Sequence, residues 1–217
     1  LANGRFGDWR RAPTNWQPFH PSHDDYQIPG ECRRIIARCL NVGTRHRLLH
    51  QTDVNQAFEE AEAGLPVVLA FTHHDYRDMR PDIGNVYSML IRAKSKFPNV
   101  KFKYSEAREA IKLALGTKRS EKIHLKMNLN GKRLSINSNV PTFGPQPFLA
   151  LETKSGEFFW DNCDFQKPYR EWSYTLDEHT ILLKDLKSIG VASCDKNYNI
   201  CVSVKSLETM ETTTRQM

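Results

Sequence analysis

One stretch of the sequence is dense in side chains that transfer protons. Residues 72–78 follow a short apolar run at 65–71 and contain His73, His74 and Asp75. Histidine titrates near neutral pH, so His74 followed by Asp75 is typical of a general acid/base unit. Neighbouring residues of a strand point in opposite directions, which makes His73 an alternate to His74 rather than its partner. A purely structural alternative is a pair of strand-end histidines that cap neighbouring loops.

Four residues are candidates for contacting a substrate beside this cluster. They are the aromatic and charged residues Tyr76, Arg77, Asp78 and, from an earlier part of the chain, Trp16. A run of ionisable groups at a strand end favours a functional role, because perturbed titratable groups gather at such sites.

A second ionisable cluster suggests metal binding in a loop. His20, His23, Asp24 and Asp25 offer nitrogen and oxygen ligands of the kind that zinc accepts. The alternative is a polar loop whose aspartates cap turns. Several arginines between residues 33 and 47 suit an anionic substrate, or a solvated helix face.

These clusters require elements that position them. The apolar run at 66–71 has the length of a buried strand, and helical spacing predicts helices over 31–40, 53–63, 81–97 and 105–115. Alternating apolar and basic residues predict another strand over 100–104. Helices that alternate with strands specify parallel strands joined by crossovers, whose carboxyl ends collect functional residues.

The pattern changes after a polar linker near residue 120. Short strands are predicted over 123–128, 133–136, 148–153, 157–160, 172–176, 180–183, 189–194 and 199–204. Turn residues separate them, and the tail from Glu208 is predicted to fray. The aromatics Phe158, Phe159, Trp160 and Trp172 are candidates for stacking on sugar rings, or for the core. The predicted fold is therefore α/β plus all-β: a partial (β/α) barrel with parallel strands over 1–118, then an antiparallel β-sandwich over 121–217.

Composition and charge exclude several classes of protein. The net charge of +6 is moderate and the basic residues are scattered among acids, so we expect no nucleic acid as a partner. No apolar run approaches the roughly 20 residues that span a bilayer, so we expect no membrane partner. Five cysteines without a C-x-x-C pair favour reduced thiols and a cytoplasmic location.

The segment from Val67 to Asp75, the strand beginning at Val100 and the helix that follows Ser105 together resemble the last two β/α units of polysaccharide deacetylases. The resemblance covers roughly residues 50–116 and implies a distorted (β/α) barrel in which His74, or alternatively His73, is the catalytic acid. It also implies a divalent metal, most commonly zinc. The family's metal-binding residues lie in an earlier segment, which implies either a preceding segment that supplies them or a degenerate relative.

These observations predict metal-dependent hydrolysis of an amide or ester on a carbohydrate. A metal-bound water would attack the acyl carbon while His74 protonates the leaving amine. One alternative is a non-catalytic carbohydrate-binding or assembly module. Another is a glycoside hydrolase, which needs two carboxylates about 5–9.5 Å apart, with Asp24, Asp25, Asp75 and Asp78 as candidates. Because a partial barrel leaves sheet edges open, we expect a preceding segment or a second copy to cover residues 1–116.

Overall fold

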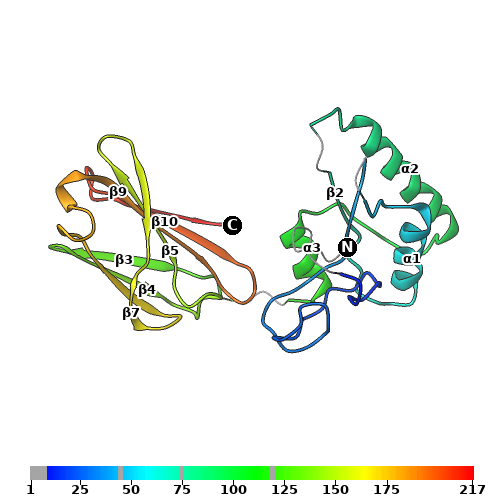
Figure 1. Cartoon of the computed structure of the whole chain (residues 1–217), viewed down its shortest axis with the longest axis horizontal. Coiled ribbons are helices and arrows are strands. Elements are labelled where there is room, and N and C mark those ends of the chain that lie inside the picture. The colour runs from blue at the N-terminus through cyan, green and yellow to red at the C-terminus, as the bar shows by residue number, and fades with distance from the viewer. Residues whose placement is uncertain (1–8, 44–45, 74–75, 118–120) are drawn as a thin grey trace. The chain divides into compact units, whose positions relative to one another are not determined.

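The computed structural model describes residues 9–43, 46–73, 76–117 and 121–217. The chain divides into two compact units, residues 1–117 and 118–217, and each has its own hydrophobic core (Figure 1). Among the described residues, the helices are all too short or too polar to cross a membrane.

Within its described residues, the first unit contains two short parallel strands and three helices. Its elements are β1 (Cys39–Asn41), α1 (Gln51–Glu62), β2 (Ala70–Thr72), α2 (Arg80–Lys96) and α3 (Ala107–Ala114). β1 pairs with β2 in parallel, with Asn41 opposite Thr72, and α1 is the crossover that joins them. Figure 1 shows α1 and α2 side by side.

Trp16 lies at the centre of the first core and is completely buried. Its indole Nε1 donates to the carbonyl oxygen of Asp53 at 3.0 Å. The guanidinium of Arg38 lies 4.3 Å from the centre of the indole ring and pairs with the Asp53 carboxylate at 2.7 Å. The long loop that carries Trp16 is therefore tied to the start of α1.

The predicted partial (β/α) barrel is wrong. Most strands of the described chain belong to antiparallel sheets, and only β1 and β2 are parallel. The backbone N–H of Val68 donates to the carbonyl of Trp16, so the first part of the predicted 66–71 strand does not join β1. Residues 100–104 form no strand, and Phe102 instead packs against Phe58 of α1 with ring centres 5.6 Å apart.

The predicted helix over 31–40 is also wrong. Ile36 exchanges two backbone hydrogen bonds of 2.9 Å with Phe19, and residues 39–41 form β1. Gly30 closes the same loop, because its N–H donates to the carbonyl of His20 at 2.7 Å. Long-range backbone pairing has overridden the local helical spacing.

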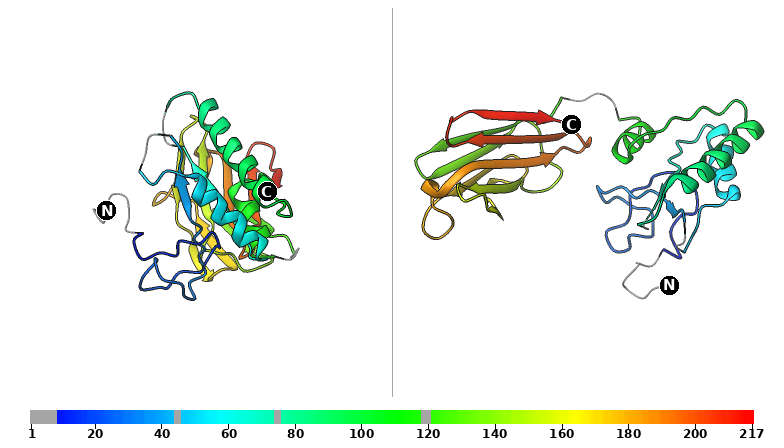
Figure 2. Two further views of the ribbon diagram at one scale, coloured as in Figure 1. Left: turned by 90° about the vertical axis from the view of Figure 1, so that its right-hand side faces the viewer. Right: turned by 90° about the horizontal axis from the view of Figure 1, so that it is seen from above.

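The second unit consists of antiparallel strands. They are β3 (Leu125–Asn130), β4 (Arg133–Ser138), β5 (Phe148–Thr153), β6 (Phe158–Asp161), β7 (Asp164–Lys167), β8 (Glu171–Thr175), β9 (Leu186–Cys194), β10 (Ile200–Ser206) and β11 (Thr212–Gln216). One sheet has the order β3-β4-β8-β7 and the other β11-β10-β9-β5-β6. The two sheets form two layers (Figure 2).

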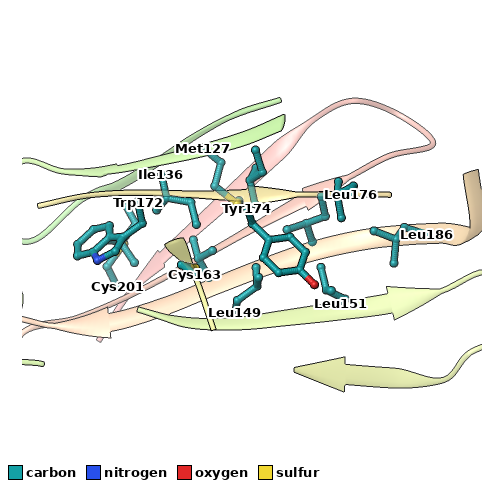
Figure 3. Close-up of a cluster of buried hydrophobic side chains, with 14 of the residues drawn as sticks. Met127, Ile136, Leu149, Leu151, Cys163, Trp172, Tyr174, Leu176, Leu186 and Cys201 are labelled. Carbon is teal, nitrogen blue, oxygen red and sulfur yellow. The ribbon is translucent and has the colours of Figure 1, made fainter. Parts of the chain in front are cut away.

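Side chains from both sheets fill the space between these layers. Figure 3 shows Ile136 and Trp172 of the four-stranded sheet facing Leu149, Leu151 and other residues of the five-stranded sheet. Each of the four named side chains is at most 1% exposed. The alternation of apolar and polar residues along the strands produces this arrangement, because side chains of a strand alternate between its two faces.

Three details of the second unit differ from the sequence-based expectations. Residues 180–183 form no strand and are followed by the short 3-10 helix η1 (Leu183–Asp185). The tail predicted to fray forms β11, which pairs with β10. The four-residue strand β7 (Asp164–Lys167) was not expected from the sequence.

We predict that Gly30→Ala destabilises the first unit by about 1–3 kcal/mol. A Cβ atom at Gly30 would lie 2.6 Å from Cα of Ser22, so the backbone would have to shift. Urea unfolding followed by the circular dichroism of α-helices reports on the first unit, since every α-helix of the described chain belongs to it.

Gly84→Ala is the matched control for this substitution. Gly84 lies inside α2, and an added Cβ there would have no heavy atom within 4 Å. We expect this change to stabilise the unit by up to about 1 kcal/mol, because glycine is a poor helix former. Equal unfolding midpoints for Gly30→Ala and the unchanged protein would contradict the close approach.

Candidate functional site

At the carboxyl end of β2, the carboxylate of Asp82 is close to two basic side chains. Nε2 of His73 lies 3.2 Å from Oδ2 of Asp82, and a guanidinium nitrogen of Arg77 lies 2.6 Å from the same oxygen. The His73 side chain is only 7% exposed. His73 thus joins β2 to the first turn of α2. The predicted catalytic residues His74 and Asp75 lie outside the described residues.

The predicted substrate contacts do not gather around one cleft. Tyr76 is fully exposed, whereas Trp16 is completely buried. Asp78 accepts hydrogen bonds from the side chain and the backbone N–H of Arg80, and these bonds lower the pKa of its carboxyl below the ordinary value. Asp78 therefore interacts with the start of α2.

Two of the four residues predicted to bind a metal, His20 and Asp25, make contacts within the protein. Nδ1 of His20 lies 2.8 Å from the carbonyl oxygen of Cys32. Asp25 pairs with Arg11 at 2.6 Å and accepts a hydrogen bond from the N–H of Gln27. No group of three or more potential metal ligands occurs within the described parts of the chain, so the expected metal site at His20, His23, Asp24 and Asp25 is corrected. Binding of a divalent metal elsewhere stays a prediction.

A different group of residues stands out on the second unit, and it begins with β5. Leu149 and Leu151 of β5 face the core, so the alternate residues Phe148 and Ala150 face outward. β6 pairs with β5 so that Trp160 lies opposite Ala150, on the outer face.

The outer face therefore carries three large aromatic side chains, Phe148, Phe158 and Trp160, which are 57%, 75% and 70% exposed. Phe158 is two residues before Trp160 on β6 and shares its face. We call these three side chains the aromatic face.

Small side chains lie beside the aromatic face. Ala150 pairs with Gly190 of β9, and Gly190 pairs with Val204 of β10. A Cβ atom added at Gly190 would lie 3.8 Å from both Ala150 and Val204, which confirms that these residues share one surface. Ala150 and Gly190 project little above the sheet, so on their side of Trp160 the indole ring is open to a ligand.

Polar groups lie next to the aromatic residues on the same sheet. Glu152 is opposite Phe158 and binds Lys187 and Ser188, each at 2.8 Å. The hydrogen bond from Lys187 lowers the pKa of the Glu152 carboxyl, and the one from Ser188 adds to this effect. The ionised carboxylate is a strong hydrogen-bond acceptor.

Two contacts hold the edge strand β6 in place. The hydroxyl of Tyr174, on β8 of the opposite sheet, donates to the Asp161 carboxylate of β6 at 2.8 Å. Beyond β6, the side chain of Gln146 binds the backbone N–H of Cys163 at 3.1 Å and the side chain of Asn162 at 2.8 Å. Trp160 directly precedes Asp161, so these contacts also position the aromatic face.

The sequence singled out only part of this surface. Phe159 points to the other side of β6, opposite Leu151, and Trp172 is buried with its indole N–H donating to the carbonyl of Pro145. Phe148 was not singled out. Its position on the same face as Trp160 follows from the outward alternation of β5 and from strand pairing.

Comparisons of this chain with protein-family models, with curated proteins and with solved structures found no match. The resemblance to polysaccharide deacetylases therefore stays an expectation from the sequence.

We predict that the stability of the second unit falls as the pH rises from about 10 to about 12. Burial raises the pKa of Tyr174 to about 12, and the hydrogen bond to Asp161 adds to the shift. The unfolded chain releases this proton near pH 10, so the stabilisation is complete below about pH 10 and is lost as the pH approaches the folded value.

Tyr174→Phe tests this assignment. Burial also raises the pKa of the nearby Cys163 thiol to about 12, so the variant should show a smaller fall in stability rather than none. Urea unfolding of both proteins at several alkaline pH values, followed by the methyl resonances of Leu149 and Leu151 in the second core, measures the difference. Parallel stability curves for the two proteins would contradict the role of Tyr174.

Proposed function

We propose that the aromatic face binds carbohydrate and that the protein acts as a non-catalytic carbohydrate-binding protein. The observation that supports this best is the exposure of Phe148, Phe158 and Trp160 on one outer sheet face. Contiguous exposed apolar surface on a folded protein marks a binding site.

The chemistry of the aromatic face suits a sugar ring. One face of a pyranose ring presents C–H groups, and these pack against the flat face of an indole or phenyl ring. Trp160 and Phe158 project from alternate positions of one strand, roughly 7 Å apart, so adjacent units of a chain can contact successive aromatic residues. Aromatic side chains offer a large contact area at little conformational cost.

The polar neighbours of the aromatic face suit sugar hydroxyl groups. The carboxylate of Glu152 accepts hydrogen bonds, and so does the hydroxyl oxygen of Ser188, whose own proton is donated to Glu152. A binding site of this kind needs a few polar groups beside an apolar surface to orient its ligand. The proposal therefore includes both apolar stacking and hydroxyl recognition on the same sheet.

Hydrolysis of an amide or ester on the carbohydrate stays a prediction from the sequence. Its two central residues, His74 and Asp75, lie outside the described residues. The carbohydrate-binding proposal does not depend on them, because the aromatic face belongs to the second unit.

A reducing compartment such as the cytoplasm is the location that we propose. All five cysteines are described and all are free thiols, namely Cys32, Cys39, Cys163, Cys194 and Cys201. Free thiols persist where the cell keeps them reduced.

We predict that Trp160→Ala weakens carbohydrate binding about tenfold or more, since truncation of a central aromatic residue at a binding surface typically costs over ~1.4 kcal/mol. Phe158→Ala should weaken binding in the same direction. Affinity electrophoresis of the full chain in gels containing cellulose derivatives, xylan, chitosan or mannan measures the change. The unchanged protein should be retarded by at least one of these polysaccharides.

Phe159→Ala is the matched control because Phe159 lies on the same strand but faces the other side. It should bind as the unchanged protein does, after thermal unfolding has confirmed that each variant is folded. Absence of retardation on every polysaccharide, or equal weakening by Phe159→Ala, would refute the proposal. A dimer that dissociates on Trp160→Ala, without carbohydrate binding, would instead identify the aromatic face as a contact between copies.

A further inference from the structure

The first unit has a hollow of about 450 Å³ at the carboxyl end of β1. Its lining includes two guanidinium groups, two imidazoles and one carboxylate, from Arg38, Arg47, His46, His50 and Asp53. These residues come from the segment before β1, the loop after it and the start of α1. The hollow lies in a different unit from the aromatic face.

Asn41 anchors the loop that carries His46 and Arg47. Its backbone N–H donates to the carbonyl of Arg47 at 3.0 Å, and its side-chain amide donates to the carbonyl of His46 at 2.5 Å. The carbonyl of Asn41 accepts a hydrogen bond from the N–H of Leu49 at 2.8 Å. These three bonds hold residues 46–49 against the end of β1.

The charges in the hollow do not cancel. Asp53 pairs with Arg38 at 2.7 Å, and its other oxygen accepts the backbone N–H of His50 at 3.0 Å. Arg47 forms no ion pair with any of the described residues, so its charge adds to the hollow. Each imidazole, of His46 and His50, carries at least one N–H donor in either tautomer.

The start of α1 adds a favourable field to these side chains. This 12-residue helix begins at Gln51, directly after His50. The first turn of a helix carries a partial positive charge. In α1 the N–H groups of His50 and Asp53 already have partners in a capping box, so the helix end contributes its field and not these two donors. The side chains and the helix end therefore favour the same sign of ligand.

We propose that this hollow binds a small oxyanion, such as a phosphate, a sulfate or a carboxylate. The guanidinium of Arg47 supplies the charge and a planar set of donors, and the imidazoles of His46 and His50 supply further donors. Arg38 is paired with Asp53 and forms part of the lining of the hollow. The proposal is independent of carbohydrate binding by the second unit.

Arg47→Asn tests the proposal without loss of folding. Arg47 has a backbone φ of 58°, in the left-handed region where asparagine is tolerated better than arginine. We therefore expect the variant to unfold at the same temperature or a higher one, while its affinity for oxyanions falls roughly tenfold. Loss of binding then reports on the guanidinium rather than on stability.

The measurement is a titration of the full chain, followed by the backbone amide resonances of residues 46–53. Inorganic phosphate, sulfate and acetate are added separately at constant ionic strength, with chloride as the reference. We expect saturable shifts with a dissociation constant on the order of 1 mM for at least one oxyanion. Binding of phosphate alone points to a phosphoryl ligand, sulfate alone to a sulfate ester, and acetate to a carboxylate.

Arg34→Asn is the control, because it removes an equally exposed positive charge that does not line the hollow. It should leave the dissociation constant within about twofold of the unchanged value. Linear, non-saturating shifts with every oxyanion would overturn the proposal. Equal weakening by Arg34→Asn and Arg47→Asn would also overturn it, since binding would then follow net charge alone.

Discussion

The packing of two sheets over one core is the constraint on which the second unit depends. Leu149 and Leu151 must face this core, and the period of two along a strand then turns Phe148 and Ala150 outward. The register of β6 on β5 places Trp160 beside Ala150. A slip by one residue would exchange the two faces of β6, so the position of the exposed aromatics follows from the burial of the leucines.

The first unit depends on a different interaction, the burial of Trp16 over the start of α1. The indole binds the backbone of Asp53, while Arg38 covers the ring and pairs with the Asp53 carboxylate. The same carboxylate accepts the N–H of His50. One network therefore holds the long loop, the residues before β1 and the first turn of α1 together, and Arg47 has no ion-pair partner among the residues that the structure describes.

Helices were easier to predict than the arrangement of strands. The predicted helices over 53–63, 81–97 and 105–115 agree with α1, α2 and α3 within a few residues, because amphipathic spacing is a local signal. The barrel required strands at 66–71 and 100–104 to join one parallel sheet. Instead, Val68 donates to the carbonyl of Trp16, and Phe102 packs on Phe58. Such long-range contacts cannot be predicted from the spacing of apolar residues along the chain.

The sequence by itself determined the three helices and most strands of the second unit, and it left the aromatics near Trp160 open between an exposed face and the core. Only the tertiary structure decided which side chains share a surface. Phe148 and Trp160 are twelve positions apart in the sequence and share a face through the pairing of β5 with β6. His73 is close to Asp82, and His20 bonds to the backbone of its own loop. These residues of the two predicted clusters therefore have different partners. The physical reason is that the contacts of a side chain depend on how distant segments pair and pack. The types of neighbouring residues in the sequence do not specify that pairing.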